Sequence, residues 1–163
     1  MHDFGVSSKE AKAKIELINK EVEKLYNDLD NTLIIITSDH GQIDVDGEVE
    51  FYKDKKLNSM LEYVPYLDAR TPAFKVKKGK EEEFEKLFKD KYSEDFELYK
   101  SKDLIDAGYF GRKGEYGYLL GDYIAIGTYT HKLFISYEGM TRFKGHHTSL
   151  TEEMEVPLII LGK

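Results

Sequence analysis

Two short clusters of polar residues in this sequence could hold a divalent metal ion. Asp39 and His40 come just after a strand-like apolar run and are followed by Gly41, while His146 and His147 form the second cluster. A carboxylate oxygen and imidazole nitrogens both suit ions such as Zn²⁺ or Mn²⁺. Open α/β sheets place their ligand sites beyond the carboxyl ends of their strands, which is where Asp39 and His40 fall.

Both clusters also have plain structural interpretations. The first could be an exposed turn, because adjacent strand residues point to opposite faces and share an ion only after a bend, which Gly41 permits. The second could be a loop in which Thr148 or Ser149 begins a short helix. Neighbouring histidines rarely bind one ion together, so we expect one ligand there and one group that either supports a ligand or faces the substrate. On their own, His2 is a weak candidate and His131 is best interpreted as a surface histidine.

The amino-terminal region predicts a helix followed by a buried strand. Ser7 and Glu10 have the S-x-x-E spacing in which each side chain caps the other's free backbone N–H group. The segment Thr32–Ser38 has a continuously apolar centre, which is typical of a central parallel strand covered on both faces. The similar run Pro157–Leu161 predicts a strand in the same sheet. Apolar residues at steps of three and four indicate one helix face: Ile15, Ile18, Val22, Leu25 and Leu29.

The middle of the chain has a different character. Residues 45–143 are rich in Lys, Glu, Tyr and Phe and form short alternating segments. We predict strands at 73–77, 123–126 and 132–136 and a helix at 81–89, together an inserted α+β lobe. Residues 1–44 and 144–163 would then form one α/β core, interrupted by this lobe.

The composition excludes several classes of function. The 163 residues include no Cys, which removes disulfides, thiolate metal sites and Cys nucleophiles. A formal net charge of −7 argues against binding duplex nucleic acid, which needs a surplus of Lys and Arg. No apolar run approaches the roughly 20 residues that cross a bilayer, and the amino terminus does not resemble a signal peptide. We therefore expect a cytoplasmic protein without a membrane partner.

Three segments together resemble the alkaline phosphatase superfamily, and most closely its type I phosphodiesterase/nucleotide pyrophosphatase branch. They are HDFGVSSKEAKAKI, TLIIITSDHGQ and KGHHTSLTEEMEVPLIILG, which occur in the family's order. The resemblance implies an α/β fold that forms part of an alkaline-phosphatase-like core, with residues 45–143 as the specificity insertion. It also implies a hydrolase that acts on a small phosphorylated substrate, such as a nucleotide or a phosphodiester.

The resemblance further implies two divalent metal ions, either Zn²⁺ or Mn²⁺, that activate a Ser or Thr nucleophile. Carried over by position, Asp39 and His40 would bind one ion, and His2 and His147 would bind the other. His146 stands at a variable position of the family motif and receives no ligand role. We expect the insertion to set substrate choice, because loops over the edge of a sheet normally shape the pocket. Tyr109, Phe110 and Arg112 are candidate substrate contacts, and ordinary packing and a turn are the favoured alternative.

The family pattern also contains residues that this chain lacks. In the family pattern, the nucleophile and two Asp ligands precede the position of His2. We therefore expect the chain to be the carboxyl-terminal part of a longer enzyme and to be inactive alone. We also expect it to self-associate through apolar faces that the rest of the enzyme would cover. A phosphomutase or a sulfatase relative is an alternative within the superfamily. A non-catalytic binding module formed by residues 45–143 is an alternative of another class. A third is a single-ion site built from Asp39, His40 and one more His.

Overall fold

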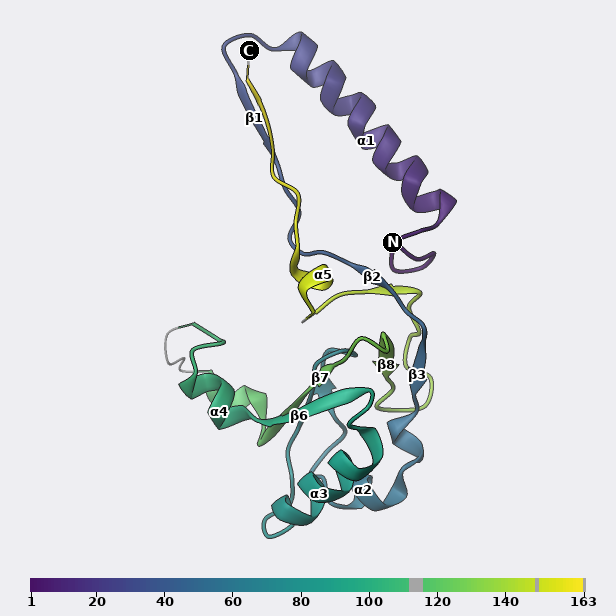
Figure 1. Cartoon of the computed structure of the whole chain (residues 1–163), viewed down its shortest axis with the longest axis vertical. Coiled ribbons are helices and arrows are strands. Elements are labelled where there is room, and N and C mark those ends of the chain that lie inside the picture. Colours follow the sequence, from purple (N-terminus) through teal and green to yellow (C-terminus); the bar gives the residue numbers. More distant parts are fainter. Residues whose placement is uncertain (112–115, 149, 163) are drawn as a thin grey trace. The chain divides into compact units, whose positions relative to one another are not determined.

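A computed structural model describes residues 1–111, 116–148 and 150–162 of the chain. The chain divides into two compact units (Figure 1). Unit 1 comprises Met1–Val45 and Phe143–Lys163, and unit 2 comprises Asp46–Arg142. In the described part of the chain, we find no helix that is both long enough and apolar enough to cross a membrane.

Unit 1 begins with helix α1 (Lys9–Asp28). The predicted helix is confirmed, but the predicted cap was wrong by one residue, because the Ser8 hydroxyl accepts the Ala11 N–H group at 3.1 Å. Ser7 is otherwise engaged, since its backbone N–H and its side chain both bond the Asp44 carboxylate. A contact distant in sequence therefore decides which serine caps the helix.

The two apolar runs form one antiparallel ribbon (Figure 1). β1 (Leu33–Ile36) pairs with β10 (Ile159–Gly162), and Ile35 lies opposite Ile160. The prediction that both runs share a sheet is confirmed, but the prediction of a buried parallel strand was wrong. Ile35 is 58% exposed and Ile160 is 57% exposed, because a two-stranded ribbon does not carry the helix layers that cover a central strand.

Helix α1 also presents apolar side chains to solvent. Ile15 is 52% exposed, Ile18 is 58% exposed and Leu25 is 47% exposed, although the three belong to the predicted helix face. The Tyr26 hydroxyl donates to the Gly162 carbonyl oxygen at 3.1 Å and so links α1 to β10. Self-association through such exposed faces stays a prediction, which sedimentation of an Ile18→Asp variant would test.

A second, shorter pairing connects the segments on either side of unit 2. β2 (Ile43–Asp44) lies antiparallel to β9 (Gly145–His146), with Ile43 opposite His146. The short helix α5 (Thr151–Met154) follows, and the fully buried Glu153 carboxylate accepts the Leu150 N–H group at 3.0 Å. This pairing brings the carboxyl-terminal histidines back to the amino-terminal part of the chain.

The elements of unit 2 are β3 (Gly47–Val49), η1 (Phe51–Lys53), α2 (Lys55–Ser59), β4 (Tyr66–Leu67), β5 (Pro72–Phe74), α3 (Glu81–Tyr92), β6 (Phe96–Lys100), α4 (Ser101–Asp106), η2 (Gly117–Leu120), β7 (Tyr123–Gly127) and β8 (Lys132–Phe134). Four of the strands form an antiparallel sheet with the order β4-β5-β7-β6, and β3 and β8 form a separate parallel pair. The predicted strand at 123–126 and the predicted helix at 81–89 are confirmed as β7 and α3. The strands predicted at 73–77 and 132–136 are shorter, as β5 and β8, and β6 was not predicted.

The core of unit 2 is aromatic. Phe51, Phe74 and Phe134 are fully buried, and the rings of Phe51 and Phe134 lie 4.7 Å apart. Phe84 and Phe88 of α3 belong to the same core. Burial of aromatic side chains of this size supplies a large apolar contribution to stability. Unit 2 thus has a hydrophobic core of its own.

Candidate metal site

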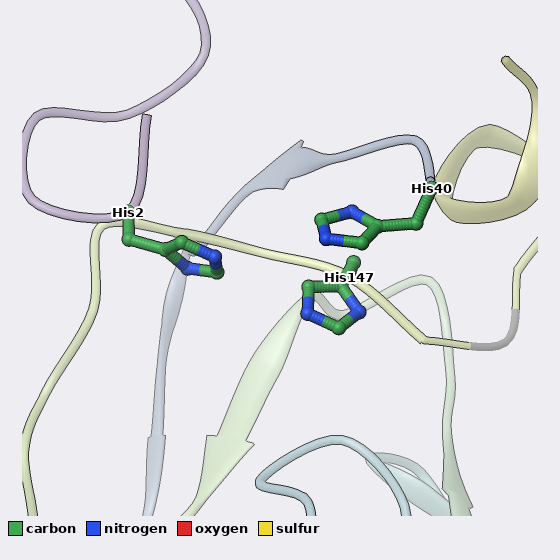
Figure 2. Close-up of side chains that lie close together, drawn as sticks. All are labelled: His2, His40 and His147. Carbon is green, nitrogen blue, oxygen red and sulfur yellow. The ribbon is translucent and has the colours of Figure 1, made fainter. Parts of the chain in front are cut away.

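Three histidines from distant parts of the sequence converge within unit 1 (Figure 2). His2 precedes α1, His40 lies between β1 and β2, and His147 directly follows β9. One ring nitrogen from each lies within 4.8 Å of the others, and all three residues are half-buried. Imidazole nitrogens at such spacing are suitable ligands for a divalent transition metal.

The backbone fixes His2 in this cluster. Its carbonyl oxygen accepts the N–H groups of Lys144 at 2.8 Å and Gly145 at 3.1 Å. Its ring Nδ1 lies 2.8 Å from the Gly145 carbonyl oxygen. Because a carbonyl oxygen only accepts, Nδ1 carries the proton in this contact and Nε2 keeps the free lone pair. Metal-binding histidines commonly have this arrangement, in which one ring nitrogen binds the ion and the other donates its proton to a protein group.

His40 shows the same arrangement, with Nδ1 at 2.7 Å from the Gly41 carbonyl oxygen. Its Nε2 is therefore the atom left to bind an ion. Asp39 Oδ2 lies 3.6 Å from that Nε2, and Oδ1 accepts the His40 N–H group at 3.2 Å. The Asp39 side chain is 87% exposed, so it lies beside the three imidazoles rather than within their cluster.

The imidazole rings differ in how they face one another. The rings of His40 and His147 are stacked, with centroids 3.7 Å apart and planes inclined by 21°. The ring of His2 lies 5.6 Å from that of His147 and 6.4 Å from that of His40, at steep angles to both. Figure 2 shows the stacked rings of His40 and His147 with His2 to one side.

Two glycines allow the histidine segments to approach neighbouring backbone. A Cβ atom at Gly41 would lie 2.6 Å from the Glu152 carbonyl oxygen, and one at Gly145 would lie 2.9 Å from the Met1 carbonyl oxygen. Gly41 does not have a positive φ angle. Our interpretation of Gly41 as a residue that permits a bend was therefore incomplete, since the space beside its Cα is what requires glycine.

Asp44 anchors the segment that carries His2. Its carboxylate accepts the backbone N–H groups of Val6 and Ser7, the latter at 3.3 Å. The hydrogen bond from the Ser7 side chain lowers the pKa of the Asp44 carboxyl, burial opposes this effect, and the two backbone N–H groups lower the pKa further. The ionised form is thus favoured in the folded chain.

This anchor predicts a pH dependence of stability. A pKa that is lower in the folded chain stabilises the fold above the ordinary Asp value of about 4, and this stabilisation is lost as the pH falls through the folded pKa. We expect Asp44→Asn to lower stability at pH 7 and to lose less stability than the parent chain on acidification to pH 3. Urea unfolding of the metal-free chains, followed by circular dichroism, measures both effects.

Asp39→Asn is the matched control, because that carboxylate is exposed. An equal response of Asp39→Asn and Asp44→Asn at both pH values would contradict the anchoring role. Nothing in the sequence singled out Asp44, since its partners Val6 and Ser7 precede it by 38 and 37 residues.

The remaining predicted positions lie elsewhere. His146 is buried and falls outside the three-imidazole group. His131 lies in unit 2, with its Nδ1 at 3.5 Å from an Asp46 carboxylate oxygen, and it is not a member of the three-imidazole group. Tyr109 and Phe110 are exposed residues of unit 2, and Arg112 lies outside the described residues.

Solved structures define the class of fold. Murine ectonucleotide pyrophosphatase/phosphodiesterase 5 matches 99% of this chain with a TM-score of 0.76 and 18% identity. The human protein of that name matches 99% with a TM-score of 0.75 and 20% identity. Phosphonoacetate hydrolase from Sinorhizobium meliloti matches 98% with a TM-score of 0.67 and 16% identity. The chain therefore has a mixed α/β fold similar to that of these solved proteins, and the predicted α/β fold class is confirmed.

The family follows from the sequence. The model of the type I phosphodiesterase/nucleotide pyrophosphatase family matches residues 1–149, and the chain belongs to this family. The chain spans 44%, 43% and 42% of the lengths of the three solved proteins, in the order given above. No curated protein matches the sequence significantly.

Proposed function

We propose that this chain supplies the histidine ligands of a metal centre that hydrolyses phosphodiester or pyrophosphate bonds in small phosphorylated substrates. The observation that carries the proposal is the convergence of His2, His40 and His147 within 4.8 Å. Membership of the phosphodiesterase family supports the type of reaction. An inactive form of the murine protein, in complex with AMP, has a fold similar to this chain, with a TM-score of 0.72, which supports a nucleotide as one substrate class.

The donor set fits two ions better than one. Two imidazoles on one tetrahedral Zn²⁺ have ring centroids roughly 5 Å apart, given Zn–N distances of about 2.0–2.1 Å. The separation of 5.6 Å between His2 and His147 is compatible with such sharing. The separation of 3.7 Å between His40 and His147 is too short for it. We therefore assign His2 and His147 to one ion, and Asp39 with His40 to a second.

The assigned residues suit Zn²⁺ or Mn²⁺, because both ions accept imidazole and carboxylate ligands. When bound, two such ions supply positive charge to the phosphoryl oxygens. Because the chain has a formal net charge of −7, the positive charge of the ions would offset the repulsion between the protein and an anionic substrate. His2 and His40 contribute by holding their Nδ1 protons on backbone carbonyl oxygens, which leaves Nε2 of each ring as the nitrogen available to an ion. We further propose that residues 46–142 select the substrate.

A direct test separates metal binding from turnover. We expect the 163-residue chain to retain Zn²⁺ after dialysis but to hydrolyse bis(p-nitrophenyl) phosphate no faster than buffer. Three imidazoles and one nearby carboxylate are too few for two closed coordination shells, and we propose that the nucleophile and two Asp ligands belong to another part of a longer enzyme. Metal analysis and absorbance at 400 nm measure the two properties.

Two outcomes would contradict this proposal. If the dialysed parent chain holds no more Zn²⁺ than the His147→Ala variant, the cluster does not form a metal centre. Turnover above the buffer rate that disappears in Asp39→Ala would show that the chain is catalytic by itself. His131→Ala is the matched control for loss of an imidazole outside the cluster, because His131 lies in unit 2.

A further inference from the structure

We propose that His146 is a positioning residue that holds the rings of His2 and His147 in the orientation needed for metal binding. This inference rests on the proposed function, because a positioning role requires that His2 and His147 bind an ion. His146 is only 4% exposed, whereas the neighbouring His147 is half-buried. His146 is not a member of the three-imidazole group. A buried imidazole beside ligands, but not among them, is placed to orient those ligands.

The first contact of His146 is with its neighbour. The rings of His146 and His147 are stacked, with centroids 5.2 Å apart and planes inclined by 24°. The Nδ1 atom of His146 lies 2.9 Å from both the backbone nitrogen and the carbonyl oxygen of His147. The ring can thus bond this peptide group in either tautomer, accepting from the N–H group or donating to the oxygen. The plane of His146 is thereby fixed, and it restricts the plane of His147.

The second contact is with the amino-terminal histidine. The ring of His146 meets that of His2 edge-on, with centroids 5.6 Å apart and planes inclined by 78°. Phe143 contacts both rings, at 5.0 Å from His2 and 5.6 Å from His146. The His2 ring is therefore confined by two neighbouring rings as well as by the hydrogen bond from its Nδ1 to Gly145. Such confinement lowers the loss of side-chain freedom when an ion binds.

The position of His146 in the chain makes this link possible. It is the last residue of β9 and lies opposite Ile43 of β2, so backbone pairing fixes its Cα position. His147 follows immediately, outside the strand. The buried ring of His146 thus contacts both His147, which follows β9, and His2, which lies near the amino terminus.

Two variants of His146 separate a ring that positions its neighbours from a nitrogen that binds the ion. His146→Phe keeps an aromatic ring, whereas His146→Asn keeps a polar group and removes the ring. We expect His146→Asn to lower Co²⁺ affinity by about 10- to 100-fold, the range typical for loss of an orienting partner. We expect His146→Phe to lose clearly less affinity than His146→Asn, because it loses the Nδ1 hydrogen bond but preserves the ring contacts. The visible absorption of bound Co²⁺ should shift in His146→Asn and not in His146→Phe.

The controls keep every outcome informative. His131→Asn removes an imidazole from unit 2 and should leave both measurements unchanged. If a His146 variant does not fold, Phe143→Leu removes a ring that touches both His2 and His146, and we expect at least about a tenfold loss. Unchanged Co²⁺ affinity in His146→Asn, or in Phe143→Leu, overturns the positioning role.

A loss in His146→Phe as large as in His2→Ala would show that His146 is itself a ligand, which also overturns the inference. Failure of the proposed function has a different signature. If the parent chain binds no Co²⁺, the proposed function and this inference both fail. If the parent chain binds Co²⁺ and the His146 variants bind it equally well, only the inference fails.

Discussion

His147→Ala is expected to lower the Zn²⁺ affinity of the chain by more than about 100-fold, which exceeds the 10- to 100-fold loss typical of an orienting partner. His147 is the ring that contacts both of the other ligands, at 3.7 Å from His40 and 5.6 Å from His2. Its removal takes away one nitrogen and also leaves His40 without its stacking partner. Isothermal titration with Zn²⁺, supported by metal analysis after dialysis, measures the loss.

The assignment of the ligands to two ions also predicts how many Zn²⁺ ions a second variant should bind. His40→Ala should lower the number of Zn²⁺ ions bound at saturation while sparing the ion shared by His2 and His147. His131→Ala serves as the control, since its imidazole lies beside Asp46 in unit 2. A change of less than about threefold in His147→Ala would rule out the cluster as a metal centre.

Gly41→Ala is expected to destabilise the fold by about 1–3 kcal/mol, the usual cost of forcing an extra methyl group into a packed site. The new Cβ would lie 2.6 Å from the carbonyl oxygen of Glu152 and 2.7 Å from that of Glu155. Both are backbone atoms, so neither can be relieved by turning a side chain. His40 precedes Gly41 directly and bonds its carbonyl oxygen, so we also expect at least about a tenfold loss of Zn²⁺ affinity, as for a disturbed orienting contact.

Gly47→Ala provides a matched control for this substitution. Neither Gly41 nor Gly47 has a positive φ angle, and the atom nearest to a Cβ at Gly47 would belong to the Lys132 side chain, at an ordinary 3.6 Å. Urea unfolding and Zn²⁺ titration of both variants separate the general effect of glycine replacement from the clash beside His40. Equal stability and equal Zn²⁺ affinity of the two variants would show that the close approach at Gly41 is unimportant.

Local patterns predicted much of the secondary structure. The three- and four-residue spacing predicted α1, a helix was also predicted where α3 lies, and short alternating or apolar segments predicted β5, β7 and β8 of unit 2. The strand β6 was not predicted. The same approach was wrong for the environment of β1. A continuous apolar run shows that both faces of a strand are apolar, but it does not supply the layers that cover them.

The ligand candidates could also be read from residue type and motif. His2, Asp39, His40 and His147 were all selected from the sequence, and three of them lie together in the structure. The sequence could not show that Asp39 lies to one side, with an 87% exposed side chain, or that His40 and His147 are stacked. These relations depend on side-chain orientations that neighbouring residues alone do not determine.

The amino-acid sequence by itself determined the family and the positions of α1, α3 and several strands, and it supplied the candidate metal ligands. Only the tertiary structure decided that Ser8 caps α1, that Asp44 anchors the amino terminus, and that His146 is buried in contact with the rings of His2 and His147. The physical reason is distance along the chain. The ring of His2 is fixed by Gly145, which lies 143 residues away, and such a contact arises from the folded path of the backbone rather than from any local pattern.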